Sequence, residues 1–151
     1  MEKPAINTLC LLIAYTGCVV SEALELKKQN FDFAGEAVMF NNIHSNVKNE
    51  IRYVPLPLTV LKVLDQTHGI RIAKIGPKSA GSELLWPIHR VTAWRQISTV
   101  MKEAGIEESQ ANPRVLRHTF VIRCKKAGYS KLAVQNWLGL AKLPAVYEHM
   151  F

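Results

Sequence analysis

Cysteines are scarce in this sequence, and their placement excludes two kinds of stabilised fold. The 151 residues contain three cysteines, Cys10, Cys18 and Cys124, which are odd in number and have no CxxC spacing. They therefore indicate neither a disulfide framework nor a zinc site. We expect no metal and no other cofactor, and a protein that works in a reducing cytoplasm.

Glycine-rich phosphate loops and membrane-length apolar runs are also lacking. No GxGxxG or Walker motif occurs, which argues against a nucleotide-binding protein. The most apolar stretch, residues 6–20, faintly resembles a signal peptide ending in a lipid-modified Cys18, but the start Met-Glu-Lys-Pro has no clear basic excess. The stretch is also too short and too often interrupted by polar residues to span a bilayer. We interpret it as a buried core helix and expect no membrane partner.

Acidic residues are few relative to basic ones. Twelve Asp and Glu stand against nineteen Lys and Arg, which gives a net charge of +7 and a pI near 9.5. Such a balance favours a polyanionic partner, either a nucleic acid or an anionic membrane. The charge is concentrated in residues 112–151, which hold a single acid, Glu148, and seven basic residues: Arg114, Arg117, Arg123, Lys125, Lys126, Lys131 and Lys142.

Helical patterns account for most of the chain. Apolar residues recur at helical spacing after Pro57, and again in a stripe that Gly105 closes. Asn112-Pro113 and Ser130 are favourable helix starts. The predicted helices cover about residues 4–15, 21–26 with Ser21 as the cap, 58–64, 94–104, 113–128 and 131–138.

The remaining segments predict a small sheet and a loop. Apolar residues 37–40 and 51–54, separated by a polar segment, are typical of a β-hairpin, with Lys48 near its tip. The basic, Gly-containing residues 68–82 indicate a surface loop. The fold class is therefore mainly α (α+β) with a small antiparallel β-hairpin inserted early, and a doubly wound fold is excluded. We expect the tryptophans to be core anchors: Trp86, Trp94 and Trp137.

Two arginines near one helix end are the first candidates for chemistry. Arg117 follows Arg114 by three residues, so both side chains project from the start of the helix after Asn112 and could grip one phosphate. Spacing alone leaves open that they form only a solvated face or a salt bridge.

The amino-acid sequence around these arginines resembles that of a known family. Residues 112–120 read Asn-Pro-Arg-Val-Leu-Arg-His-Thr-Phe, which resembles the Pro-His-x-Leu-Arg-His-Thr/Ser-Phe box of tyrosine recombinases of the phage integrase family. Residues 134–139 and Tyr147-Glu148-His149 resemble its Leu-Gly-His and nucleophile segments. Upstream, residues 15–24 resemble the Thr-Gly-x-Arg-x-Ser-Glu box and residues 48–56 the lysine-bearing hairpin. The resemblance covers nearly the whole chain in the family's order.

The resemblance implies an activity and a partner. In that family a tyrosine attacks a phosphodiester of double-stranded DNA and forms a 3′-phosphotyrosine link, without metal or small-molecule cofactor. It also implies a single catalytic domain over residues 1–151 without the N-terminal DNA-clamping domain. Association as a homo-oligomer or with an active recombinase is a further expectation.

The implied site residues follow position by position. Tyr147 is the nucleophile, Arg117 and Arg114 hold the phosphate, and Lys48 donates to the leaving oxygen. We expect a buried structural hydrogen bond for His118. The implied DNA contacts are Arg114, Arg117, Lys48, Arg123, Lys142 and His149.

Several positions depart from the family pattern. Val19 stands where the first box has arginine, Leu140 where the Leu-Gly-His motif has histidine, and Arg114 where the central box has histidine. The stretch from Leu140 to Tyr147 is also shorter than usual. We therefore expect DNA binding with impaired catalysis, or a non-catalytic DNA-binding or accessory module. A helical transcription regulator or RNA-binding protein is the remaining alternative.

Overall fold

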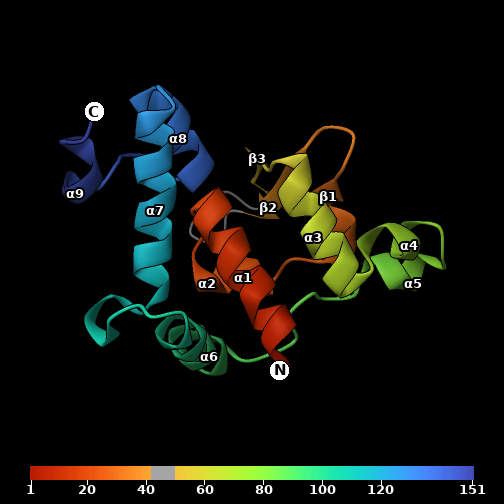
Figure 1. Cartoon of the computed structure of the whole chain (residues 1–151). Helices are drawn as coiled ribbons and strands as arrows, with labels where there is room; N and C mark the ends of the chain where they lie inside the picture. Colours follow the sequence, from red (N-terminus) through yellow and green to blue (C-terminus); the bar gives the residue numbers. More distant parts are fainter. Residues whose placement is uncertain (42–49) are drawn as a thin grey trace.

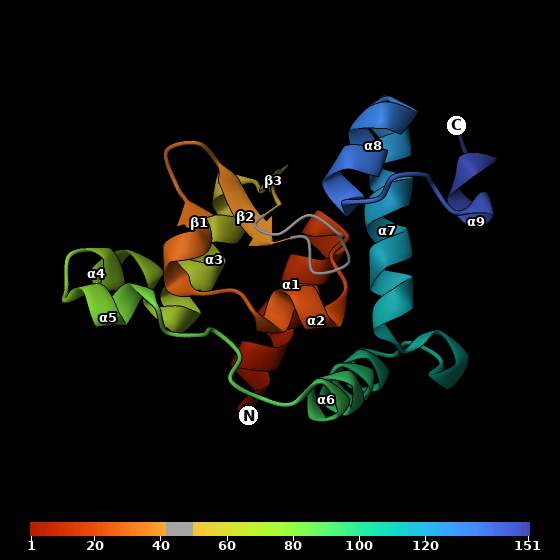
Figure 2. The same ribbon diagram turned by 180° about the vertical axis from the view of Figure 1, so that it is seen from behind.

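Helix α1 (Lys3–Thr16) lies at the centre of the molecule. The computed structural model describes residues 1–41 and 50–151. Helices α3 (Leu58–His68), α6 (Arg90–Glu103) and α7 (Pro113–Lys126) all pack against α1, and Figures 1 and 2 show α6 near the N-terminal end of α7. Helix α1 is apolar enough to be covered on several sides, as the buried-helix interpretation of residues 6–20 predicted.

A sharp turn separates α1 from α2 (Val20–Leu24). Gly17 adopts a left-handed conformation (φ 69°), and its amide donates to the Ile13 carbonyl at 2.8 Å. A Cβ on Gly17 would lie 2.3 Å from the Phe120 ring, so α7 approaches here more closely than any other residue type would allow. The prediction that Ser21 caps α2 is wrong. The cap position is Val19, whose amide donates to the Glu22 carboxylate at 3.2 Å, because Glu22 reaches back over the first turn.

The sheet is small and antiparallel. It has the order β1 (Phe31–Asp32), β2 (Ala37–Asn41) and β3 (Ile51–Pro55), with Val38 opposite Val54 and Phe40 opposite Arg52. The predicted hairpin is confirmed, whereas β1, which follows a short 3-10 turn η1 (Lys28–Asn30), was not predicted. Lys48 lies outside the described residues.

The predicted surface loop at residues 68–82 contains two short helices, α4 (Ile70–Lys74) and α5 (Lys78–Gly81). The loop prediction was therefore wrong. Ile70 and Ala73, three residues apart, are buried, and this tertiary contact stabilises helical turns that a short basic sequence would not form alone.

The prediction for Trp94 also differs from the structure. The tryptophans at 86 and 137 pack inward, Trp86 completely, but Trp94 on α6 is 50% exposed. The core-anchor prediction for Trp94 is wrong because the face of α6 that packs on α1 and α2 is centred on Ala93 and Ile97, and Trp94 lies beside it.

The two helices predicted after Asn112 and Ser130 match the structure closely, whereas the short helix at Ala145–Glu148 was not predicted. Asn112 caps α7 and Ser130 caps α8 (Lys131–Leu138), and Gly139 ends α8 in a left-handed conformation. A 3-10 turn η2 (Glu108–Gln110) precedes α7, and α9 (Ala145–Glu148) is the last helix among residues 50–151.

Buried apolar residues form two clusters. The larger one lies around α1 and takes in α3, α6 and the sheet. The smaller one joins α7, α8 and α9, and Trp137 packs against both. The buried members of the smaller cluster are Phe120, Val121, Cys124, Val134, Leu138, Leu143 and Tyr147. Within the described part of the chain, no helix is long and apolar enough to cross a membrane.

Candidate active site

The first turns of α7 carry two arginines. The Asn112 side chain accepts a hydrogen bond from the Val115 amide at 3.1 Å, which fixes the start of the helix. Arg114 is exposed and Arg117 is half-buried. The helix start is positively polarised, so an anion beside these arginines would be stabilised by the helix dipole and by the arginine charges.

Tyr147 on α9 lies against these arginines. Its side chain is 4% exposed, and its ring meets the His118 ring edge-on with centroids 5.1 Å apart. Burial raises the pKa of Tyr147, which the charge and hydrogen bond of Arg117 and the charge of Arg114 oppose. The phenol is therefore neutral near pH 7, and the Arg117 guanidinium lies near enough to act on it. For His118, the expected buried hydrogen bond is not formed with any residue that the structure describes, and its half-buried side chain makes this ring contact.

Helix α9 is held at both ends. Leu143, just before it, is buried in the smaller cluster, and Glu148 pairs with Lys131 of α8, which lowers the pKa of that carboxyl. Lys142 and His149 are exposed beside α9, and the His149 ring lies 3.0 Å from the Ala145 carbonyl. Both therefore lie at the edge of the Tyr147 site.

Arg123 lies elsewhere. Its guanidinium donates to the Ala14 carbonyl at 2.9 Å and stacks on the Tyr15 ring at 3.8 Å. These contacts join α7 to the end of α1. The structure thus brings Arg114, Arg117 and Tyr147 together, whereas Arg123 lies at the end of α1, and its DNA contact stays a prediction.

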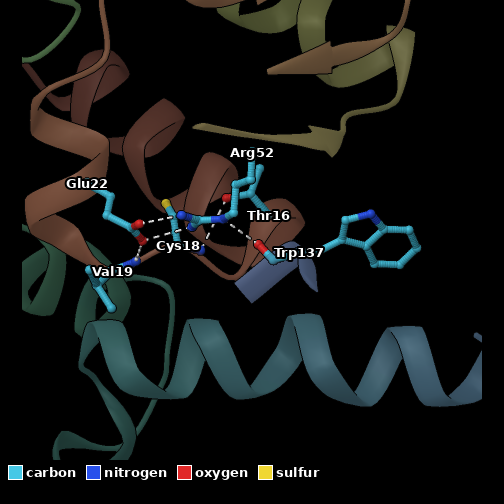
Figure 3. A network of polar contacts seen from close by, with 6 residues as sticks. All are labelled: Thr16, Cys18, Val19, Glu22, Arg52 and Trp137. Carbon is cyan, nitrogen blue, oxygen red and sulfur yellow. Dashed lines mark hydrogen bonds and ion pairs between the residues drawn. The ribbon is translucent and has the colours of Figure 1, made fainter. Parts of the chain in front are cut away.

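A buried ion pair between Arg52 and Glu22 was not predicted from the sequence (Figure 3). The Arg52 guanidinium binds the Glu22 carboxylate through two contacts of 2.6 and 3.0 Å, and its Nε donates to the Trp137 carbonyl at 2.8 Å. It thereby joins β3, α2 and α8. One sequence signal was available. Residues two apart in a strand point to the same face, so Arg52 shares the inward face with Val54, whereas Tyr53 points outward.

Two of the three positions that depart from the family pattern, Val19 and Leu140, carry apolar side chains. Val19 lies at the turn before α2, close to this ion pair, and Leu140 packs against the smaller cluster. The charge of Arg117 acts on neighbouring Cys18, so this turn lies near the α7 arginines. Burial raises the pKa of the Cys18 thiol to about 12, so Cys18 does not supply a thiolate.

The geometry defines an anion site beside a tyrosine. Arg117 and Arg114 can neutralise a phosphate, and the charges of both arginines act on the Tyr147 phenol. Over the described residues, no group of three or more His, Cys, Asp or Glu side chains could hold a metal ion.

A mainly helical chain with a three-stranded sheet after α2, and with α7 arginines facing a tyrosine near the C-terminus, has the architecture of a tyrosine recombinase catalytic domain. The sequence model described as the phage integrase family matches residues 3–149. The chain therefore belongs to the phage integrase family, and the predicted family and fold class are confirmed.

Solved structures share this fold. XerA recombinase is 21% identical, with 99% of this chain and 62% of that chain covered and a TM-score of 0.70. XerH site-specific recombinase bound to difH substrate is 19% identical, with 100% and 45% covered and a TM-score of 0.75. The Tn1549 transposon integrase in complex with transposon right end DNA is 18% identical, with 97% and 54% covered and a TM-score of 0.72.

The chain spans roughly half the length of these recombinases, between 45% and 62%. No curated protein sequence matches it.

Proposed function

We propose that this chain binds double-stranded DNA as an integrase-type domain, in the cytoplasm, with Arg117 and Arg114 holding a backbone phosphate beside Tyr147. The observation that carries the proposal is the Arg117–Tyr147 contact, which places a nucleophile type and a phosphate-binding type side by side. The net charge of +7 supports a polyanionic partner.

The reaction that this arrangement supports is a phosphoryl transfer to tyrosine. The Tyr147 oxygen attacks the phosphorus and loses its proton, the bond from phosphorus to the 5′-oxygen breaks, and that oxygen takes up a proton. Arg117 and Arg114 stabilise the charge of the transition state. Lys48 is the proposed donor to the leaving oxygen.

Catalysis by this chain is proposed to be weak. Val19 and Leu140 bring no hydrogen-bond donor to the phosphate, and removing a charge-stabilising group from a transferring phosphate costs on the order of 10³ to 10⁵ in rate. Binding depends on many phosphate contacts and survives such losses. A non-catalytic accessory role, alone or with an active recombinase, is the second candidate, and the same two side chains favour it.

One experiment tests the reaction. The chain is incubated with a nicked suicide duplex and covalent adducts are resolved by denaturing electrophoresis, with Tyr147→Phe and Tyr129→Phe as matched variants. Tyr129, between α7 and α8, is an exposed tyrosine. A faint adduct that Tyr147→Phe abolishes and Tyr129→Phe preserves supports the reaction.

The double variant Val19→Arg/Leu140→His makes the outcome decisive. We expect it to raise the adduct yield at least tenfold, since it restores donors at both positions. A duplex gel shift without adduct in any variant would support the accessory role. No gel shift at low salt would contradict DNA binding altogether.

A further inference from the structure

Two isoleucines on a small lobe of the molecule lie open to solvent. Helices α4 and α5 form this lobe, residues 70–81, which we call the α4–α5 lobe. Ile70 and Ala73 are buried, whereas Ile72 is 71% exposed and Ile75 is 86% exposed. Single exposed apolar side chains are common on soluble proteins, but two large ones on the same side of a helical turn form a patch that a partner surface could cover.

The α4–α5 lobe is also basic. Residues 66–82 contain Arg71, Lys74 and Lys78 and no Asp or Glu. Arg71 pairs with an acid of α3, and Lys74 donates to a backbone carbonyl of β1. Lys78 is exposed and has no ion-pair or side-chain hydrogen-bond partner among residues 1–41 and 50–151. Lys74 and Lys78 line an open hollow of about 420 Å³ on the lobe. An apolar patch beside a cation without a counter-charge favours an acidic partner surface.

A segment of complementary character lies on the other side of the molecule. Residues 103–108, from the last residue of α6 to the first of η2, contain three glutamates around Ile106, which is 38% exposed; we call them the acidic turn. Two of these glutamates pair with lysines, whereas Glu107 is exposed and has no ion-pair partner in the part of the chain that the structure describes. Figures 1 and 2 show the acidic turn and the α4–α5 lobe at opposite sides of the molecule, so the two cannot meet within one copy.

A second copy of this chain is the partner that these two surfaces fit. If two lobes packed against each other, each Lys78 would face the cations of the other lobe, and like charges would oppose the contact. If the lobe of one copy meets the acidic turn of another, opposite charges and apolar side chains face each other instead. Because the two surfaces are different and lie on opposite sides, each bound copy still offers one free surface to a further copy.

We infer that the α4–α5 lobe of one copy binds the acidic turn of the next, head to tail, with Ile75 packed against Ile106 and Lys78 paired with Glu107. The contact uses neither α9 nor the arginines of α7. It therefore forms without DNA and does not depend on the proposed function. A surface of this small size gives weak association, and its exposed ion pair makes that association sensitive to salt.

Sedimentation velocity of the chain without DNA tests this contact. We expect the weight-average sedimentation coefficient to rise with protein concentration at about 0.05 M salt, without stopping at a dimer, and to rise far less at about 0.5 M salt. Lys78→Glu and Glu107→Lys should each weaken association about tenfold, since each places like charges opposite one another. Lys126→Glu and Glu25→Lys are the matched controls, because they make the same charge changes at exposed positions outside both surfaces, and they should leave association nearly unchanged.

Restoring the complementarity identifies the two surfaces. An equimolar mixture of Lys78→Glu and Glu107→Lys should associate nearly as strongly as the unmodified chain, because the changed lobe of one variant fits the changed turn of the other and the unchanged surfaces fit as before. The double variant Lys78→Glu/Glu107→Lys should associate with itself to a similar degree. Ile75→Ser should weaken association severalfold at both salt concentrations, whereas Ile122→Ser, at an exposed position on α7, should not.

Four outcomes would overturn the inference. A sedimentation coefficient that does not change with concentration at low salt removes it, and a gel shift with duplex DNA then shows separately whether the proposed function stands. Equal weakening by the control variants, or no recovery in the mixture, places the contact elsewhere. Association that ends at a dimer and is unaffected by Glu107→Lys assigns the lobe to a symmetric contact. Cosedimentation with vesicles of phosphatidylglycerol and phosphatidylcholine that Ile75→Ser abolishes, without self-association, assigns the lobe to an anionic membrane.

Discussion

At the scale of single residues, Gly139 and Arg52 lie too close together for any side chain to fit between them. Gly139 has a φ of 70°, and a Cβ at this position would lie 2.7 Å from the Arg52 guanidinium. That guanidinium is already fixed by Glu22 and by the Trp137 carbonyl. A side chain at 139 would therefore strain the backbone and also push against a buried ion pair.

We predict that Gly139→Ala destabilises the protein by about 3 kcal/mol or more, because breaking a buried ion pair costs about 3 to 5 kcal/mol. Gly105→Ala is the matched control, since Gly105 also has a positive φ but a Cβ added there would meet nothing within 4 Å. It should cost only the backbone strain, about 1 to 2 kcal/mol. Urea unfolding measures both, and equal losses would contradict the role given to Arg52.

The same pair shows why part of the site could not be predicted from sequence. Glu22 and Arg52 are 30 residues apart, and nothing local to either position predicts the other. Arg117 and Tyr147 were predictable only through the family resemblance, since a contact between two such distant residues depends on how α9 folds back onto α7. The prediction for Trp94 was wrong because helical periodicity identifies a stripe but not its edge.

At the scale of elements, predictability follows local signals. Helices α7 and α8 were predicted within about two residues because Asn112, Ser130 and Gly139 are capping residues whose hydrogen bonds lie within one turn. Helices α4 and α5 and strand β1 were missed because each is a few residues long and depends on tertiary contacts.

The cap of α7 gives an element-scale prediction. Asn112→Ala should lower stability by about 1 kcal/mol, since it removes the side-chain oxygen that accepts from the Val115 amide and leaves that amide only the Asn112 backbone carbonyl. It should also weaken duplex binding, because Arg114 is in the turn that frays. Ser130→Ala removes the equivalent cap from α8 with a similar loss of stability, and it leaves the α7 arginines in place. If both variants weaken DNA binding equally, the effect is global and not due to α7.

The junction of α3 with α1 is sensitive to pH. His68, the last residue of α3, lies 2.7 Å from the Thr8 hydroxyl, and its ring meets Trp86 edge-on at 5.2 Å. The Thr8 hydroxyl donates its proton to the Ala5 carbonyl. In the bond between the two side chains, the His68 Nε2–H is therefore the donor and the Thr8 oxygen the acceptor. Burial, and secondarily the charge of Lys28, lower the pKa of His68 to about 4.

This shift makes stability fall in acid. An unfolded histidine has a pKa near 6.5, so below that pH the unfolded chain binds a proton that the folded chain does not. The stability that the neutral ring contributes is complete above about pH 6.5 and is lost progressively towards pH 4. We expect His68→Gln, which keeps a donor for Thr8, to lose less stability between about pH 7 and about pH 5 in urea unfolding. An identical pH dependence in both proteins would contradict this.

At the scale of the whole molecule, the division into two apolar clusters separates the scaffold from the tyrosine. The larger cluster extends from α1 to α6 and the sheet, whereas the smaller one consists of a few side chains from α7, α8 and α9. Tyr147 belongs to the smaller cluster, and α9 is four residues long. Segments with few buried apolar contacts open at lower free energy than the rest of a domain.

We therefore predict that the segment from α8 to the C-terminus exchanges its amide hydrogens by local opening, while α1 exchanges only with global unfolding. Leu143→Ala should increase exchange in α8 and α9, because it removes a buried side chain that anchors α9, and should leave protection in α1 almost unchanged. Leu12→Ala, in the larger cluster, is the control and should lower protection throughout. Hydrogen exchange followed by mass spectrometry of peptides covering α1 and α8 to α9 distinguishes these patterns. Uniform loss of protection in Leu143→Ala would show that the two clusters unfold as one unit, and that Tyr147 does not leave Arg117 by local opening of its segment.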